Sequence, residues 1–214
     1  AKAYSIILAR QSGITHAYID AFAGAGIHHS REKNKLVLGS PLNALYIEPP
    51  FLEYYFIDID KKKIDILREI SAGRNDVNLY EEDSNIVPLE KIFPKVRYED
   101  FKRALCLLDP YGLHLNWEVI RIAGEMKSIE IFLNFPVLDM NRNVLWRNPD
   151  KVSKKQIERL ISFWGDNSWR SIAYRKERGL FEDIEEKVST EKIASCFRDR
   201  LREIAGFAYV PEPI

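Results

Sequence analysis

The 214-residue sequence lacks the features that mark membrane-spanning, disulfide-stapled or zinc-cluster proteins. It contains only two cysteines, Cys106 and Cys196, which are too few for a zinc cluster or a disulfide framework. No apolar run approaches the roughly 20 residues needed to cross a bilayer, and the start, AKAYSIILARQ, lacks the basic-then-apolar order of a signal peptide. These absences predict a cytoplasmic protein without a membrane span, in which both thiols are reduced and buried.

Net charge is also absent, because 32 Lys and Arg balance 32 Asp and Glu. This balance excludes a wholly electrostatic nucleic-acid binder, although charge is uneven locally. Within 141–159, six basic side chains accompany two acidic ones and Trp146. Cations hold a phosphate backbone and an aromatic ring can stack a base, so the segment predicts nucleic-acid contact through residues that include Arg142, Arg147 and Lys154. A solvated start of a helix explains the same pattern equally well.

Apolar strands alternate with amphipathic helices in the first 136 residues. The predicted strands cover 16–22, 53–60, 77–83, 103–112 and 128–136. The predicted helices cover 39–47, capped by Ser40, then 61–70, 87–93 and 117–126. Strands this continuously apolar are covered on both faces, which predicts a doubly wound, mostly parallel, Rossmann-like α/β sheet.

Beyond residue 136 the pattern becomes helical. Ser153 and Gln156 form a capping box for a helix that stops at Gly165, and a second helix ends at Gly206. The residues FAYV (207–210) predict another strand. We therefore expect a core over 1–136, a helical and locally basic segment over 137–205, and the start of a sixth strand over 206–214.

Polar residues terminate all five predicted strands, and ligands of parallel sheets bind at the carboxyl ends of strands. Asp20 ends the first strand and is followed by Gly24 and Gly26, which let the backbone approach a ligand closely. A dinucleotide fingerprint would require a third glycine where His29 stands, and this argues against a bound pyrophosphate. Asp58, after the second strand, can accept hydrogen bonds from ribose hydroxyls or simply cap the next helix.

The remaining strand ends carry similar groups. Asp83 could accept a hydrogen bond from the exocyclic amine of adenine. Asp109 begins DPYG (109–112), which in isolation is a common β-turn, and Asn134 begins NFP (134–136). Polar groups at five consecutive strand ends predict one common binding site.

These motifs resemble those of class I S-adenosylmethionine-dependent methyltransferases. DAFAGAG (20–26) is similar to their first motif, in the FxGxG form of nucleic-acid amino-methyltransferases, and DPYG is similar to their catalytic fourth motif. The resemblance implies S-adenosylmethionine as cofactor and no metal. The implied cofactor-binding residues are Asp20, Phe22, Gly24 and Gly26 for the methionine part, Asp58 for the ribose, and Asp83 and Ser84 for the adenine.

More closely, the whole chain resembles the three-Cys-motif partner proteins, a prokaryotic methyltransferase-like family. The matching pieces are YIDAFAGAG (18–26), GSPLNAL (39–45), FIDID (56–60), DSN (83–85), LDPYGL (108–113), NFP (134–136), NRN (141–143) and FWGDNSW (163–169). The resemblance implies a protein partner encoded by a neighbouring gene. It also implies a seven-stranded sheet, so we expect the last strands to lie outside these 214 residues.

DPYG suits the methylation of an exocyclic base amine. Asp109 would accept a hydrogen bond from the target NH₂, helped by the Pro110 carbonyl, and Tyr111 would stack on an unstacked or flipped base. The second proline of the D-P-P-Y form is missing. This departure puts adenine N6 in doubt and fits guanine N2 at least as well.

Other residues carry open alternatives. Asn134 either supports Asp109 or serves the turn, while Asn141 and Arg142 are candidates for phosphate contact. His28 is more simply part of a polar surface loop than a metal ligand. Two other functions compete with nucleobase methylation: a non-catalytic module that binds a partner protein or nucleic acid, and a small-molecule methyltransferase.

Overall fold

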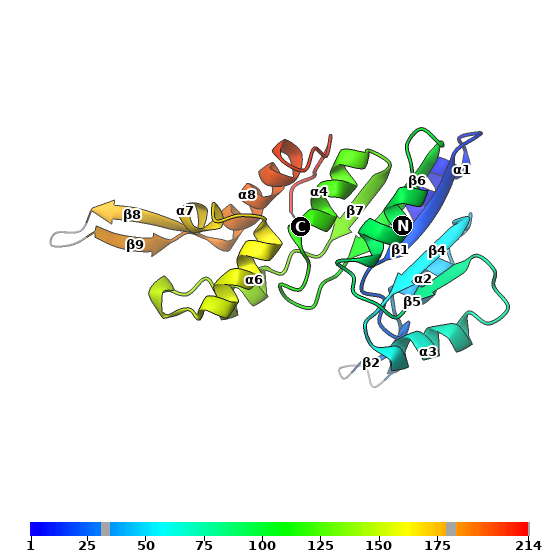
Figure 1. Cartoon of the computed structure of the whole chain (residues 1–214), viewed down its shortest axis with the longest axis horizontal. Helices are drawn as coiled ribbons and strands as arrows, with labels where there is room; N and C mark the ends of the chain where they lie inside the picture. The colour runs from blue at the N-terminus through cyan, green and yellow to red at the C-terminus, as the bar shows by residue number, and fades with distance from the viewer. Residues whose placement is uncertain (31–34, 179–182, 214) are drawn as a thin grey trace. The chain divides into compact units, whose positions relative to one another are not determined.

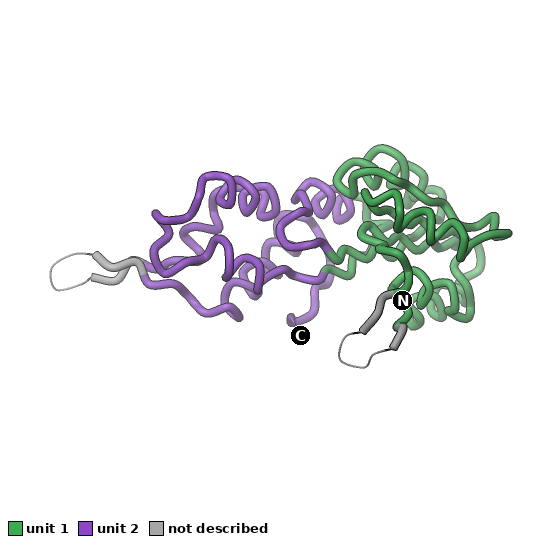
Figure 2. The backbone as a smooth tube through the Cα atoms, turned by 90° about the horizontal axis from the view of Figure 1, so that it is seen from below, with its two compact units in different colours: residues 1–109, 126–133 green, residues 110–125, 134–214 purple. Residues whose placement is uncertain are grey.

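The computed structural model describes residues 1–30, 35–178 and 183–213. The chain divides into two compact units, shown in Figure 2. Unit 1 comprises 1–109 and 126–133, and unit 2 comprises 110–125 and 134–214. The division differs from the expected boundary at residue 136 because the segment 110–125 groups with the C-terminal part of the chain.

Unit 1 is built on a five-stranded parallel sheet, and its strands are labelled in Figure 1. The strands are β1 (Thr15–Asp20), β4 (Glu53–Ile57), β5 (Val77–Tyr80), β6 (Lys102–Leu108) and β7 (Ile129–Leu133), in the spatial order β5-β4-β1-β6-β7. All five predicted strands and the doubly wound α/β class are confirmed. The strand order reverses at β1, so the carboxyl ends of β1 and its neighbours form the switch point where such sheets bind ligands.

Short helices cover the sheet of unit 1. These are α1 (Lys2–Ala9), α2 (Ser40–Leu45), α3 (Lys61–Ile70), the π-helical turn η1 (Pro88–Ile92) and the 3₁₀ turn η2 (Phe93–Lys95). The connections from β1 to β4 and from β4 to β5 run in one direction across the sheet, and the connection from β5 to β6 runs in the other. Because such connections are right-handed, α2 and α3 lie on one face of the sheet, and η1 and η2 lie on the other. On the α3 face, Ile64 and Leu67 pack in a buried cluster with the aromatic residues Tyr18, Phe51, Tyr54 and Phe56.

The expected cap of α2 is wrong by one residue. Gly39 is the N-cap, with ψ of 177°, and no side chain caps the helix. The hydroxyl of Ser40 instead interacts with the carboxylate of Asp20. Pro41 lies in the first turn, where proline costs no helical hydrogen bond.

Two antiparallel hairpins appear where no strand was predicted. β2 (Ile27–Ser30) pairs with β3 (Lys35–Leu38), so His28, which was expected in a polar surface loop, lies on a strand. In unit 2, β8 (Tyr174–Arg178) pairs with β9 (Asp183–Lys187), and Figure 1 shows this hairpin extending away from α6 and α8. The segment 137–205 is therefore not purely helical.

Unit 2 otherwise consists of helices around an aromatic core. The elements are α4 (Trp117–Met126, of which 117–125 belong to this unit), α5 (Val137–Asn143), η3 (Pro149–Lys151), α6 (Lys154–Trp164), α7 (Trp169–Ala173) and α8 (Thr190–Glu203). The capping of α6 is confirmed, because Ser153 Oγ accepts from Gln156 N at 3.4 Å and Gly165 ends the helix with φ of 101°. The rings of Phe163, Trp164 and Phe197 pack together in the core, with centroid separations of 5.4 and 5.2 Å to Phe197.

The predicted sixth strand at 206–214 is wrong for the residues that the structure describes, because 207–213 form no strand. The carbonyl of Val210 accepts a hydrogen bond from Arg198 Nε at 3.0 Å, and Phe207 N donates to the Leu201 carbonyl at 3.1 Å. Pro211 and Pro213 have no N–H to offer a neighbouring strand. The segment is thereby held by α8 and its C-terminal turn.

Candidate functional site

Asp20 ends β1 with a fully buried carboxyl group. Its Oδ1 accepts from Phe22 N at 3.3 Å, whereas its Oδ2 has no hydrogen-bond partner among the described residues. Burial raises the pKa of Asp20 to about 7; Ser40 and the Phe22 N–H oppose the rise, and the carboxylates of Asp109 and Asp58 add to it. Asp20 is therefore a poorly solvated acid close to two other strand-end acids.

The glycine turn after Asp20 requires both of its glycines. Gly24 and Gly26 have φ of 64° and 74°, in the left-handed region that side chains disfavour. A Cβ on Gly26 would lie 2.9 Å from Leu67 Cδ2 on α3, so this glycine permits close packing of the turn on the helix. A Cβ on Gly24 would meet nothing within 4 Å, which leaves open space at the turn.

Asp58 directly follows β4 and anchors this turn. Its Oδ2 accepts from Gly24 N at 3.0 Å and its Oδ1 from Asp60 N at 2.8 Å. Lys63 Nζ contacts the same carboxylate, at 3.2 Å from Oδ2 and 3.4 Å from Oδ1. Asp58, 8% exposed, thus has an internal donor on each oxygen before any ligand binds.

The residues after β5 divide into one buried and one exposed group. Ser84 is buried, and its hydroxyl donates to the backbone carbonyl of Ala21, so it ties the end of β5 to the glycine turn. Asp83 is exposed, and its Oδ1 accepts from Asn85 N at 2.8 Å and from Asn85 Nδ2 at 3.1 Å. Of the two predicted adenine contacts, Asp83 is the one open to solvent.

Asp109 follows β6 and is exposed. Its charge contributes to the raised pKa of Asp20, as expected for acids at the ends of neighbouring strands. Unit 1 therefore brings Asp20, Gly24, Asp58, Ser84 and Asp109 together at one edge of the sheet. The sequence predicted one site from all five strand ends; four of them lie in this unit, while Asn134, after the fifth strand, belongs to unit 2.

The rest of the DPYG motif belongs to unit 2. Pro110 is buried, while the Tyr111 side chain is 88% exposed. Gly112 has φ of 61°, and a Cβ there would lie 2.8 Å from the carboxylate of Asp139, so this turn admits only glycine without strain. The turn holds the Tyr111 ring in solvent on a constrained backbone.

Tyr111 has a ring neighbour, His114, that the sequence did not single out, and His114 in turn contacts Arg159. The ring of His114 lies nearly parallel to it, with centroids 6.3 Å apart and an interplanar angle of 28°. Arg159 Nη2 lies 2.6 Å from His114 Nε2, and Arg159 Nη1 is 3.3 Å from Gln156 Oε1. Because an arginine can only donate, this contact requires Nε2 of His114 to be unprotonated. His114 and Arg159 are 45 positions apart, and no local pattern links them.

The predicted substrate-contacting residues of unit 2 differ in availability. Asn141 is engaged internally, donating to Thr190 Oγ1 at 3.1 Å and accepting from Lys187 Nζ at 2.7 Å. Arg142, Arg147 and Lys154 are exposed, as is Asn134. Trp146 is 41% exposed, and its Nε1 donates to the Arg142 carbonyl at 2.8 Å. The exposed cations suit phosphate contact better than Asn141 does.

The remaining residues of interest are the buried tryptophans, the cysteines, the possible metal ligands and His28. Trp117, Trp164 and Trp169 are buried and pack in the core of unit 2. Cys106 is buried and Cys196 half-buried, and both are free thiols. Among the described residues there is no group of three or more His, Cys, Asp or Glu placed to hold a metal ion, and none of the described helices could cross a membrane. His28 lies on β2, and its side chain is outside the described part of the structure.

Comparisons with known proteins give a fold-level likeness. No family model matches the chain, and no curated protein matches it. The structure is similar to the crystal structure of protein LPL1258 of Legionella pneumophila str. Philadelphia 1, of family DUF519. The TM-score is 0.49, with 11% sequence identity over 78% of this chain and 72% of that chain. A likeness at this level carries no information about activity.

Proposed function

We propose that the protein is an S-adenosylmethionine-dependent methyltransferase that acts on an exocyclic amine of a nucleobase in DNA or RNA. The observation that carries the proposal is the hydrogen bond between Gly24 N and Asp58 Oδ2, at 3.0 Å, which joins the glycine turn of β1 to the acid that ends β4. The glycine turn follows β1, which borders the point between β1 and β6 where the strand order reverses, and sheets of this type bind nucleoside ligands there.

The residues fit the cofactor on two counts. The space facing Gly24 is open, and the Asp20 Oδ2 has no partner among the described residues. Asp20, Phe22, Gly24 and Gly26 would hold the methionine part, Asp58 the ribose and Asp83 the adenine amine. Ser84 would position the site through its bond to Ala21 rather than bind the ligand.

Bound S-adenosylmethionine would supply an electrophilic methyl group on a sulfonium. Asp109 would accept a hydrogen bond from the target amine, so that the nitrogen lone pair is directed at the methyl carbon. The exposed ring of Tyr111 would stack on the unpaired base. Arg142, Arg147 and Lys154 would bind the nucleic-acid backbone.

Calorimetric titration with S-adenosylmethionine tests the cofactor site. Gly24→Ala would place a methyl group in the open space of the turn and should weaken binding at least about tenfold, equivalent to about 1.4 kcal/mol. Gly73→Ala is the matched control, because Gly73 has φ of 85° in unit 1 and its Cβ would also meet nothing within 4 Å. Absence of binding by the folded wild-type protein, or equal losses in both variants, would contradict the proposal.

One observation favours a second candidate, a non-catalytic module that binds a partner protein or nucleic acid. Asp58 is already engaged by two backbone N–H groups and by Lys63, and it needs no ribose to satisfy it. This candidate predicts that neither the wild type nor a variant lacking the Lys63 ammonium binds S-adenosylmethionine.

We also propose membership of the three-Cys-motif partner family. Co-purification with the product of the adjacent gene tests that assignment independently of cofactor binding.

A further inference from the structure

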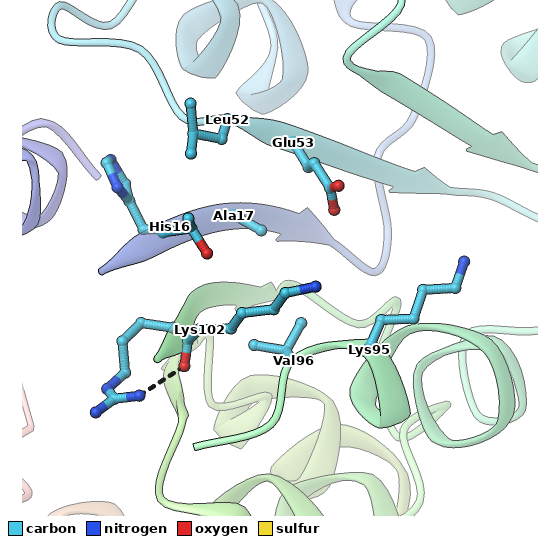
Figure 3. A pocket seen from close by; sticks show the side chains of 9 residues that line it. His16, Ala17, Leu52, Glu53, Lys95, Val96 and Lys102 are labelled. Atoms are coloured by element: carbon cyan, nitrogen blue, oxygen red, sulfur yellow. Dashed lines mark hydrogen bonds between the residues drawn. The ribbon is translucent and has the colours of Figure 1, made fainter. Parts of the chain in front are cut away.

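A cavity of about 150 Å³ lies at the amino ends of β1, β4 and β6 (Figure 3). The strands carry Asp20, Asp58 and Asp109 at their other ends, so the cavity shares no residue with the proposed cofactor site. Its walls include Ala17, Glu53, Val96 and two lysines, Lys95 and Lys102. A water occupies about 30 Å³ of liquid, so the cavity has room for roughly five waters or for a group larger than a phosphate.

The pleat of the sheet decides which side chains share this cavity. Glu53 is paired with Ala17, and Lys102 with Thr15, so these four residues point to the same face of the sheet. This is the face covered by η2, which ends at Lys95 and continues to Val96. The alternate residues His16 and Arg103, although they border the cavity, point to the opposite face.

The groups at the cavity leave a positive charge unbalanced. Lys95 Nζ lies 5.9 Å from the centroid of the Tyr55 ring, and Lys102 adds to the effect of Arg97 in lowering the pKa of Asp100. Among the described residues, neither ammonium group makes an ion pair within 4 Å or a hydrogen bond. Glu53 is held by the hydroxyl of Tyr55, which donates to its Oε2. Figure 3 shows the charged ends of Glu53, Lys95 and Lys102 toward the same side of the cavity.

The two other basic groups do not add to this charge. Arg103 Nη1 donates to the backbone carbonyl of Lys102 at 2.7 Å, and its guanidinium lies 3.8 Å from the centroid of the Tyr98 ring. His16 is bonded through Nε2 to the hydroxyl of Ser5 at 2.9 Å, and burial lowers its pKa, which favours the neutral ring. Two ammonium groups and one carboxylate therefore face the cavity.

We propose that this cavity binds a small organic phosphate that carries a hydroxyl group next to the phosphate ester. Lys95 and Lys102 donate to the phosphate oxygens in charge-assisted hydrogen bonds, because the two ammonium groups outnumber the one carboxylate at the cavity. Glu53 can only accept, so it repels a bare phosphate and binds a ligand whose hydroxyl donates to it. Ala17 and Val96 supply the apolar wall against the carbon chain.

The probe is glycerol 3-phosphate, and inorganic phosphate and glycerol are the comparison ligands. Binding of each ligand is measured from the changes in the amide chemical shifts of the full chain. We expect saturable shifts at Ala17 and Val96 with glycerol 3-phosphate, weaker binding of inorganic phosphate, and no binding of glycerol. Lys102→Met should weaken glycerol 3-phosphate about tenfold, as loss of a charge-assisted hydrogen bond does. Lys95→Met should have a smaller effect, since Lys95 is more exposed. Lys127→Met, an exposed lysine elsewhere in unit 1, should have none.

Glu53→Gln separates the two parts of the proposal. The neutral amide no longer repels an anion, so inorganic phosphate should bind more tightly and the preference for glycerol 3-phosphate should shrink. Three results would overturn the proposal: no saturable shift at Ala17 and Val96, an unchanged affinity in Lys102→Met, or an equal loss in Lys127→Met. The binding of S-adenosylmethionine is measured separately and has no bearing on these outcomes.

Discussion

The ammonium nitrogen of Lys63 lies 3.2 Å from Oδ2 of Asp58, the carboxylate that would bind a ribose. Two backbone N–H groups share that carboxylate and are fixed by the turn and by the start of α3. The Lys63 side chain is 44% exposed and has no such constraint. A ligand hydroxyl can therefore reach Asp58 only by replacing the lysine.

Removing this competitor should strengthen cofactor binding. In Lys63→Met, we expect S-adenosylmethionine to bind about 1.4- to fivefold more tightly, because a half-exposed ion pair contributes about 0.2–1 kcal/mol. Isothermal titration calorimetry measures the change. Lys62→Met, the exposed neighbour on the same helix, should leave the affinity unchanged. Weaker binding in Lys63→Met would instead assign the lysine a direct role in holding the ligand.

Asp20 should make the protein less stable as the pH rises. Its folded-state pKa of about 7 exceeds the ordinary 3.8, so the folded state holds the proton more tightly than the unfolded chain between these values. The contribution of Asp20 to the free energy of unfolding should fall across this window, by at most about 4 kcal/mol, and level off above pH 7. Asp20→Asn should remove this fall in the free energy of unfolding with pH. The substitution should therefore stabilise the protein more at pH 8 than at pH 5. Urea unfolding at pH 5 and pH 8 measures the effect. Asp150→Asn is the control, because Asp150 is 87% exposed. An effect of Asp20→Asn that is the same at both pH values would contradict the prediction.

Tyr111 should contribute to nucleic-acid binding without contributing to stability. Its ring is 88% exposed, so Tyr111→Ala should leave the unfolding midpoint nearly unchanged. Loss of one base-stacking ring costs about 1–3 kcal/mol, which predicts about five- to 150-fold weaker binding of a single-stranded oligonucleotide by fluorescence anisotropy. Tyr111→Phe should bind normally. Tyr209→Ala, in the same unit and 81% exposed, is the control; an equal loss there would exclude a specific role for Tyr111.

Asp109 should serve methyl transfer and not cofactor binding. Asp109→Asn weakens the hydrogen bond that the acid would accept from the target amine, and we expect about a hundredfold slower transfer or more. The measurement is incorporation of labelled methyl into transfer RNA and plasmid DNA, alongside calorimetry with S-adenosylmethionine. Unchanged incorporation, or loss of cofactor affinity in the variant, would remove Asp109 from the proposed role.

The parallel strands were predictable from the sequence, although β7, at the edge of the sheet, leaves Glu130 and Phe132 exposed. The segments at β1, β4, β6 and β7 are dominated by apolar residues, and burial of such segments leaves a parallel sheet as the simplest arrangement. The grouping of Asp20, Asp58 and Asp109 followed from the same reasoning, because the carboxyl ends of parallel strands share one edge.

Elements determined by tertiary contacts were not predictable. The strands β8 (YRKER) and β9 (DIEEK) are highly charged and have little intrinsic preference for extended structure. The segment FAYV has that preference, yet Arg198 takes the Val210 carbonyl that a neighbouring strand would need. The Arg159–His114 contact spans 45 residues and has no signal in a single sequence.

The division into units limits how this protein can be cut or recombined. The chain passes from one unit to the other after 109, again after 125 and again after 133, so neither unit is one continuous stretch. A truncation at residue 136 would leave 110–125 attached to unit 1 but would remove the residues that this segment packs against. Gly124 would lose Ala205 and Phe207, and the ring of Trp117 would lose Phe197. Gene fragments that end at single breakpoints should therefore yield insoluble products, and exchange of unit 2 between homologous genes would need three coordinated crossovers.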